Sequence, residues 1–139
     1  MRSTRTATQW GVSLLLLVAA GTHGPLVSEH LEEAPYVGVL FLALILACTG
    51  LAVLVLVHDS QTVWLLSASV CLLAAVAFLA SRTVGLPQLA DDVGHWTEPM
   101  GFPALVSETS VVVLASAHLI RAYVGAAPLR SAHHRKVAP

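Results

Sequence analysis

Long apolar runs separated by short polar stretches dominate the pattern along the chain. Four runs come close to or exceed the roughly 20 residues that a helix needs to cross a bilayer. They cover residues of about 10–27, 35–57, 62–80 and 102–124. Each is predicted to be a helix, because a single strand in hydrocarbon leaves its backbone N–H and C=O groups without partners. The pattern therefore predicts an all-α protein, a bundle of four transmembrane helices.

The run over 10–27 is the weakest of the four and allows two interpretations. Arg2 and Arg5 precede it, and the small residues VAAG follow its apolar centre, which is also the pattern of a cleaved secretory signal. The apolar character continues to Leu26 and Val27, however, and no A-x-A precedes a polar segment. We therefore expect an uncleaved first helix.

The composition agrees with a membrane environment. Hydrophobic residues make up 56% of the chain and charged residues 11%, whereas a soluble domain carries roughly 25% charged residues. The expected partner is the lipid bilayer. No basic stripe lies outside the tails, so nucleic acid is not an expected partner. The segments between the runs are too short for a separate domain, and residues 1–139 are predicted to form one membrane domain.

Positive residues gather at the two ends of the chain. Six of the seven lysine and arginine residues lie there, namely Arg2, Arg5, Arg121, Arg130, Arg135 and Lys136. The positive-inside rule then predicts that residues 1–9 and 125–139 are cytoplasmic tails of a plasma-membrane protein. We expect the C-terminal tail to be unstructured and to lie near anionic lipid headgroups.

Acidic and histidine residues gather in the two connections that this orientation places outside the cell, 23–34 and 81–101. Six of the eight acids lie there, namely Glu29, Glu32, Glu33, Asp91, Asp92 and Glu98. His23, His30 and His95 accompany them. The sequence therefore predicts an acidic, histidine-containing outer mouth.

Two phrases of this outer mouth resemble each other, HLEEAPYVG at 30–38 and HWTEPMG at 95–101. Both contain H-x-x-E followed by proline and glycine, and both precede a predicted helix. In one interpretation they mark two repeated helical hairpins in a parallel arrangement. In the other they are helix starts, because proline fits the first turn and glutamate complements the positive end of the helix dipole.

The same phrases supply candidate ligands for a divalent transition metal ion. Imidazole and carboxylate groups are usual donors for such ions, and the candidates are His23, His30, Glu33, His95 and Glu98. The H-x-x-E spacing places both side chains on one face if the segment is helical. The cysteine pairs of structural zinc sites are absent from the sequence. A metal site and a pair of helix starts therefore stay open as alternatives.

Glu108 is the most informative single residue, because it lies within the apolar run over 102–124. At about 1.5 Å per residue it is roughly 9 Å from the outer end of that helix. An ionisable group at this depth is costly and by default marks a paired or functional position. Arg82 is the only positive residue in the two outer connections. We therefore predict an intramembrane ion pair between Arg82 and Glu108.

A second role for Glu108 is that of a station in a proton-coupled or ion-conducting transporter. His118 lies ten residues further along the same helix, which is about 15 Å toward the cytoplasm. That distance is too long for direct proton transfer. His58, at the inner end of the predicted helix over 35–57, is an alternative partner for His118 near the inner surface.

No sequence pattern of a catalytic nucleophile, a zinc protease or a phosphate-binding loop occurs in the chain. We therefore expect a non-enzymatic protein. Two functions fit the residues: an accessory subunit in contact with other membrane subunits or with further copies of itself, or a component that binds a cation at the outer mouth. The transporter that uses Glu108 is the alternative.

Two segments carry a resemblance to known proteins, HLEEAPYVGVLF and SRTVGLPQLADDVGHWTEPMGFPALVSE. They resemble uncharacterised small four-helix integral membrane proteins of actinobacterial type, and the resemblance extends over most of the chain. It implies a four-helix integral membrane fold and no particular activity. The functional expectations therefore rest on the residues alone.

Overall fold

The computed structural model describes residues 2–135, and their side chains from Ala7 to Gly125. Its elements are α1 (Arg2–His23), the short 3-10 helix η1 (Gly24–Leu26), α2 (Val27–Glu33), α3 (Pro35–Val57), α4 (Gln61–Thr83), the 3-10 helix η2 (Ala90–Asp92) and α5 (Gly101–Arg135). Every named element of the described residues is helical, which confirms the predicted all-α class.

Four helical segments are long and apolar enough to cross a membrane. They are Ala7–Glu33, Pro35–Val57, Gln61–Thr83 and Gly101–Gly125. The first continues from α1 through η1 into α2, so the predicted helix over 10–27 is extended at both ends. The chain therefore has the architecture of a small four-span membrane protein, as the sequence predicted.

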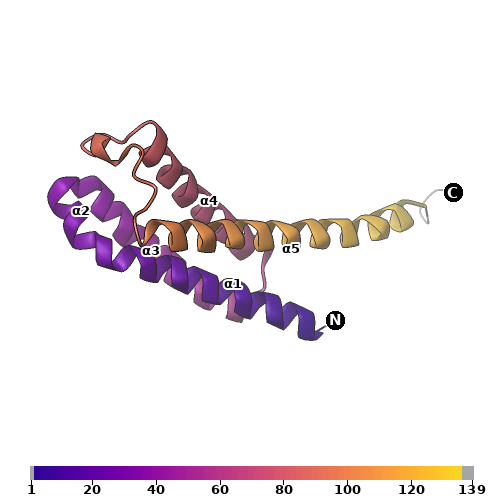
Figure 1. The fold of residues 1–139 in the computed structure, drawn as a ribbon. Coiled ribbons are helices and arrows are strands. Elements are labelled where there is room, and N and C mark those ends of the chain that lie inside the picture. Colours follow the sequence, from indigo (N-terminus) through magenta and orange to yellow (C-terminus); the bar gives the residue numbers. More distant parts are fainter. Residues whose placement is uncertain (1, 136–139) are drawn as a thin grey trace.

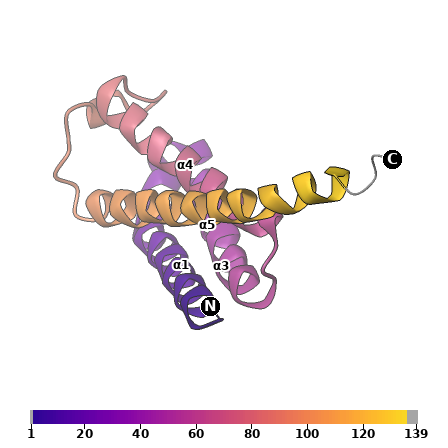
Figure 2. The same cartoon turned by 90° about the vertical axis from the view of Figure 1, so that its right-hand side faces the viewer.

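The helices form two antiparallel pairs. α1 packs against α3, α4 packs against α5, and α5 also packs against α1, whereas α3 and α4 touch over a smaller area. The long helix α5 crosses the other three at an angle (Figures 1 and 2). Both chain ends lie at one end of the bundle, here called the terminal end, together with the turn at 58–60. The opposite end, here called the loop end, carries α2 and the segment 84–100.

Helix boundaries follow from local chemistry. Ala34 has an extended backbone conformation with φ −142° and ψ 81°, as expected for a residue before proline, and it separates α2 from α3. Pro35 occupies the first turn of α3, where its missing N–H is not needed. At the terminal end, Ser60 caps α4, because its side chain accepts a hydrogen bond from the Val63 N–H at 3.3 Å.

Two predicted boundaries are corrected by the structure. Residues 23–33 are helical and not a loop, because α2 folds against α3 and Leu31 covers Gly38. At the C-terminus, α5 continues to Arg135, whereas the tail from 125 was expected to be unstructured. Alanine and arginine, which recur there, are among the strongest helix formers.

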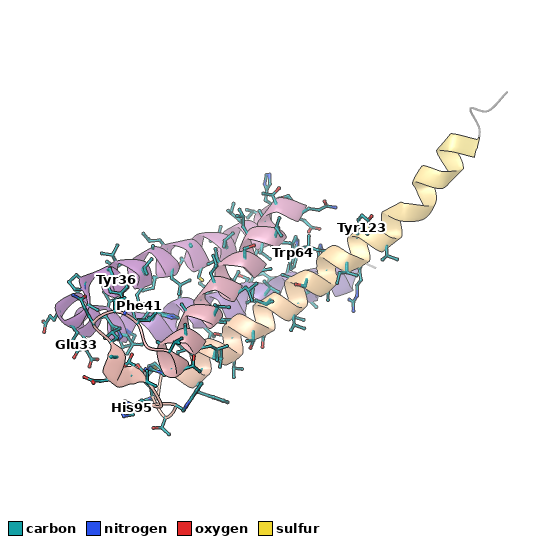
Figure 3. All side chains as sticks on the ribbon, turned by 90° about the horizontal axis from the view of Figure 1, so that it is seen from above. Glu33, Tyr36, Phe41, Trp64, His95 and Tyr123 are labelled. Carbon is teal, nitrogen blue, oxygen red and sulfur yellow. The ribbon has the colours of Figure 1, made fainter. Side chains whose placement is uncertain are left out.

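The largest core cluster fills the middle and the terminal half of the bundle. Its fully buried members include Val12, Leu16, Val55, Trp64, Val111 and Ala115. Large apolar side chains such as Leu46, which is 74% exposed, cover the outside and suit contact with lipid. Figure 3 shows Trp64 toward the terminal end and Glu33, Tyr36, Phe41 and His95 toward the loop end. The two ends thus carry different side chains.

Candidate functional site

Glu108 is buried inside the bundle, on α5. Its side chain is only 2% exposed, and its Oε1 atom lies 3.7 Å from Nε2 of His23 on α1. This distance is too long for a direct hydrogen bond, and Oε1 has no hydrogen-bond partner. The neighbouring hydroxyl groups do not supply one, because Ser107 and Ser110 donate to backbone carbonyl groups of α5. Glu108 therefore faces the imidazole of His23.

A hydrogen bond at the second ring nitrogen of His23 determines which tautomer faces Glu108. Nδ1 of His23 lies 2.8 Å from the carbonyl oxygen of Ala19. A carbonyl oxygen only accepts, so Nδ1 carries a hydrogen and donates. In the neutral ring, Nε2 is then the acceptor, and it is the atom that faces Glu108. One proton can therefore reside on either group, as a protonated carboxyl beside neutral imidazole or as a carboxylate beside imidazolium.

Arg82 has other partners than the one predicted from the sequence. Its Nη1 atom lies 2.9 Å from Oδ2 of Asp92, and its Nη2 atom pairs with Oε2 of Glu98. Among the residues whose side chains are described, these two acids replace the predicted partner Glu108 in the ion pairs of Arg82. The guanidinium group also lies 5.1 Å from the ring centre of Phe78, in the range of a cation–π contact.

The segment 84–100 explains this change of partner. It folds back over the end of α4, where the N–H of Gly94 donates to the carbonyl oxygen of Arg82 at 2.9 Å. Gly85 and Gly94 have φ values of +81° and +85°, a left-handed conformation that glycine adopts at little cost. These turns bring Asp92 and Glu98 onto Arg82.

The two H-x-x-E phrases do not share a conformation. His30 and Glu33 lie on α2, where Nδ1 of His30 donates to the carbonyl oxygen of Leu26 at 2.9 Å. His95 is exposed in the turns of the loop end, and Glu98 pairs with Arg82. The two phrases therefore differ in structure, because the first begins in a helix and the second lies in turns.

The predicted metal ligands are not assembled into one group. Between Ala7 and Gly125, no three His, Cys, Asp or Glu side chains are placed to hold a metal ion together. Two of the candidates have other partners, because His23 faces Glu108 and Glu98 pairs with Arg82. The geometry gives the metal interpretation no support.

Residues missed in the sequence lie at the terminal end. Nε1 of Trp64 donates to Oδ1 of Asp59 at 2.9 Å, and Nε2 of His118 lies 3.6 Å from the same oxygen. The rings of Trp64 and His118 stack with centroids 4.0 Å apart and an interplanar angle of 13°. Asp59 thus replaces His58 as the neighbour of His118. The signal for it was Asp59 itself, the one acid of the inner turn.

Cys48 and Cys71 are both free and fully buried. Cys48 belongs to α3 and Cys71 to α4. Small buried thiols at a helix contact behave as packing residues.

The fold and the buried pair define a class, that of a small four-helix bundle with spans suited to a membrane and an ionisable pair inside. Comparisons with protein-family models, curated proteins and solved structures found no match. The resemblance to small actinobacterial membrane proteins stays a prediction.

Proposed function

We propose that the chain is a non-enzymatic, multipass component of the plasma membrane, whose His23–Glu108 pair binds and releases a proton. In this proposal it serves as an accessory subunit or small binding protein, with both tails in the cytoplasm. The observation that carries the proposal is the buried carboxyl oxygen of Glu108, which has no hydrogen-bond partner and faces Nε2 of His23 at 3.7 Å.

The burial of Glu108 and its contact with His23 together support a proton-binding role. A charge inside a bundle is costly unless it is paired, and Glu108 is among the largest fully buried side chains. Its carboxyl group and the imidazole of His23 come from α5 and α1, which pack against each other. A purely structural carboxyl group would be expected to have both oxygens hydrogen-bonded. An oxygen left unsatisfied beside an imidazole suits a group that changes its protonation.

The surroundings support local proton binding more than conduction. Conduction from Glu108 to the terminal end needs polar groups or water along the way. The core beyond Glu108 consists mainly of apolar side chains, among them Leu16, Val55 and Val111. The hydroxyl groups of Ser13 and Ser67, which are also buried there, donate to backbone carbonyl groups. We therefore place the accessory or binding role ahead of the transporter as the proposed function.

The test is an infrared titration of the purified protein in detergent. Two groups that interact strongly titrate as a pair, in two coupled steps. We expect wild-type protein to show a carboxyl C=O band that is absent in Glu108→Gln, and to show a titration in two steps that involves both this band and the imidazole bands. In His23→Gln the carboxyl band should titrate in a single step at a different pH.

Matched controls isolate the pair. His95→Gln removes an exposed imidazole of the loop end and should leave the titration of the Glu108 band unchanged. A carboxyl band that titrates identically in wild type and in His23→Gln would refute the proposal, as would a Glu108 band that does not change between pH 4 and pH 10. A proton flux across proteoliposomes that Glu108→Gln abolishes would favour the transporter.

A further inference from the structure

A cavity of about 550 Å³ lies between α3 and α4 at the loop end. Its volume falls within the range of small-molecule sites, about 300–1,000 Å³. Along its length it is lined by apolar side chains of both helices, among them Leu44, Ala47, Val70 and Ala74. It lies where α3 and α4 touch over a smaller area than α1 and α5 do.

The cavity is accessible from the side that suits lipid. Leu40 of α3 and Leu73 of α4 both line it, and they are 59% and 69% exposed. Both belong to segments able to span a membrane. A molecule dissolved in the bilayer can therefore reach the cavity between these two helices without passing through water.

One end of the cavity is polar. Arg82, Asp92 and Glu98 line it there, and Arg82 is only 6% exposed. Two nitrogen atoms of its guanidinium group bind the two acids, but the Nε–H group is buried and has no acceptor. A buried donor without a partner calls for an explanation. A ligand oxygen at this end of the cavity would supply the missing acceptor.

The charges at this end select a neutral ligand. Arg82 carries one positive charge and its two acidic partners carry two negative charges, so the group is formally negative by one. An anionic headgroup would be repelled by the two carboxylates. A cationic headgroup would offer no acceptor to the Nε–H group. A carbonyl or hydroxyl oxygen satisfies both conditions.

A second wall residue favours a headgroup that also donates a hydrogen bond. His30 lines the cavity, and its Nδ1 atom donates to the carbonyl oxygen of Leu26. In the neutral ring Nε2 is then an acceptor. A hydroxyl-bearing head can therefore donate to one side and accept from Arg82 on the other.

We propose that this cavity binds a neutral, single-chain lipid from the bilayer, with its hydroxyl or carbonyl head at Arg82 and its chain between α3 and α4. The site goes beyond the proton pair of the proposed function. His23 of that pair also lines the cavity, but the head is held by Arg82 and not by Glu108.

The test uses two photoactivatable probes in phosphatidylcholine vesicles that contain the full chain. One is a monoacylglycerol with a diazirine in its acyl chain, and the other is a lysophosphatidic acid with the same chain, which differs by its anionic phosphate. We expect the monoacylglycerol to label residues of the cavity walls, to be displaced by excess unlabelled monoacylglycerol, and to label more strongly than the anionic probe.

Three variants make the test specific. Ala74→Phe fills the cavity and should abolish the displaceable labelling, whereas the control Val76→Phe, on the exposed side of α4, should retain it. Arg82→Lys keeps the charge but removes the Nε–H group, and should weaken displaceable binding about three- to tenfold, the effect of one hydrogen bond. Infrared amide spectra check that each variant keeps its helix content.

Several results would overturn the inference. Labelling that is spread evenly over the lipid-facing helix surfaces and is not displaced would indicate ordinary bilayer contact. Preference for lysophosphatidic acid would show that the head site is anionic. Cross-links between two copies through the cavity walls would assign the cavity to a self-association surface. Equal labelling of Ala74→Phe and wild type would remove the site from the cavity.

Discussion

The two halves of the bundle are built from the same four helices but are filled differently. In the terminal half a cluster of buried apolar side chains fills the core, and the indole N–H of the buried Trp64 has its acceptor in Asp59. The loop end contains a cavity of about 550 Å³. Two buried atoms without hydrogen-bond partners belong to Arg82 (Nε) and Glu108 (Oε1). Arg82 lines the cavity, and Glu108 faces His23, the last residue of α1.

This difference indicates where stability and where function reside. Proteins generally fill their cores and satisfy buried polar groups, and departures from both rules concentrate at functional sites. The terminal half follows the rules, so substitutions there should act on the free energy of unfolding. The loop end departs from them, so substitutions there should act on proton or ligand binding at a smaller cost in stability.

The largest expected effect is the loss of Trp64 from the terminal half. Trp64→Ala removes a fully buried ring that stacks on His118. We expect a loss in the free energy of unfolding on the order of 3 kcal/mol, the scale of large-to-small changes in a packed core. Titration of the protein with sodium dodecyl sulfate in mixed micelles measures it.

A control at a lipid-facing position tests whether the loss of stability is specific to the core. Leu46→Ala, at a position that is 74% exposed, should change the free energy of unfolding by less than about 1 kcal/mol, because it leaves no internal cavity. Equal losses for the two variants would mean that the terminal half is not the stable part of the fold.

Some features of the two halves could be predicted from the sequence and others could not. The four spans followed from run length, because hydrocarbon leaves a chain few alternatives to the helix. Glu108 was recognised because a carboxyl group is costly at that depth. Its partner His23 was not, because the packing of α1 against α5 joins residues 85 positions apart, and no local pattern encodes that contact.

The error over Arg82 has a similar origin. The sequence placed it beside Glu108 because both lay at the same end of neighbouring helices. The glycine turns of 84–100 instead return Asp92 and Glu98 to the end of α4. Gly85 and Gly94 are residues of a type common in tight turns, but no local pattern gives the direction in which these turns lead the chain.

A double-mutant cycle at Arg82 should give the next largest effect. We expect Arg82→Gln and Glu98→Gln to show a coupling of about 1–2 kcal/mol in the free energy of unfolding, because they share a partly buried ion pair. The cycle of Arg82→Gln with Glu108→Gln should be additive within about 0.5 kcal/mol. Unfolding in mixed micelles measures both cycles. Coupling in the second cycle and additivity in the first would restore the pair predicted from the sequence.

A glycine pair tests the packing of α2 on α3 at the loop end. A Cβ atom on Gly38 would lie 2.6 Å from Cγ of Leu31 and 2.8 Å from its backbone nitrogen. We expect Gly38→Ala to lower the free energy of unfolding by about 1–2 kcal/mol, because the backbone of α2 must move. Gly50→Ala meets nothing within 4 Å and should be neutral or stabilising, since alanine favours a helix. A stabilising Gly38→Ala would show that α2 does not rest on α3.

The smallest effect on stability is expected from the variants that determine which end faces the cytoplasm. The six-to-one distribution of positive residues predicts a cytoplasmic terminal end and an external loop end. Gln61→Cys and Thr97→Cys introduce exposed thiols at the terminal and loop ends, in a background in which Cys48 and Cys71 are alanine. In intact cells an impermeant maleimide should label the variant at 97, and the variant at 61 only after the membrane is opened. The reverse pattern would invert the bundle, and the proton pair and the lipid cavity would then open toward the cytoplasmic half of the bilayer.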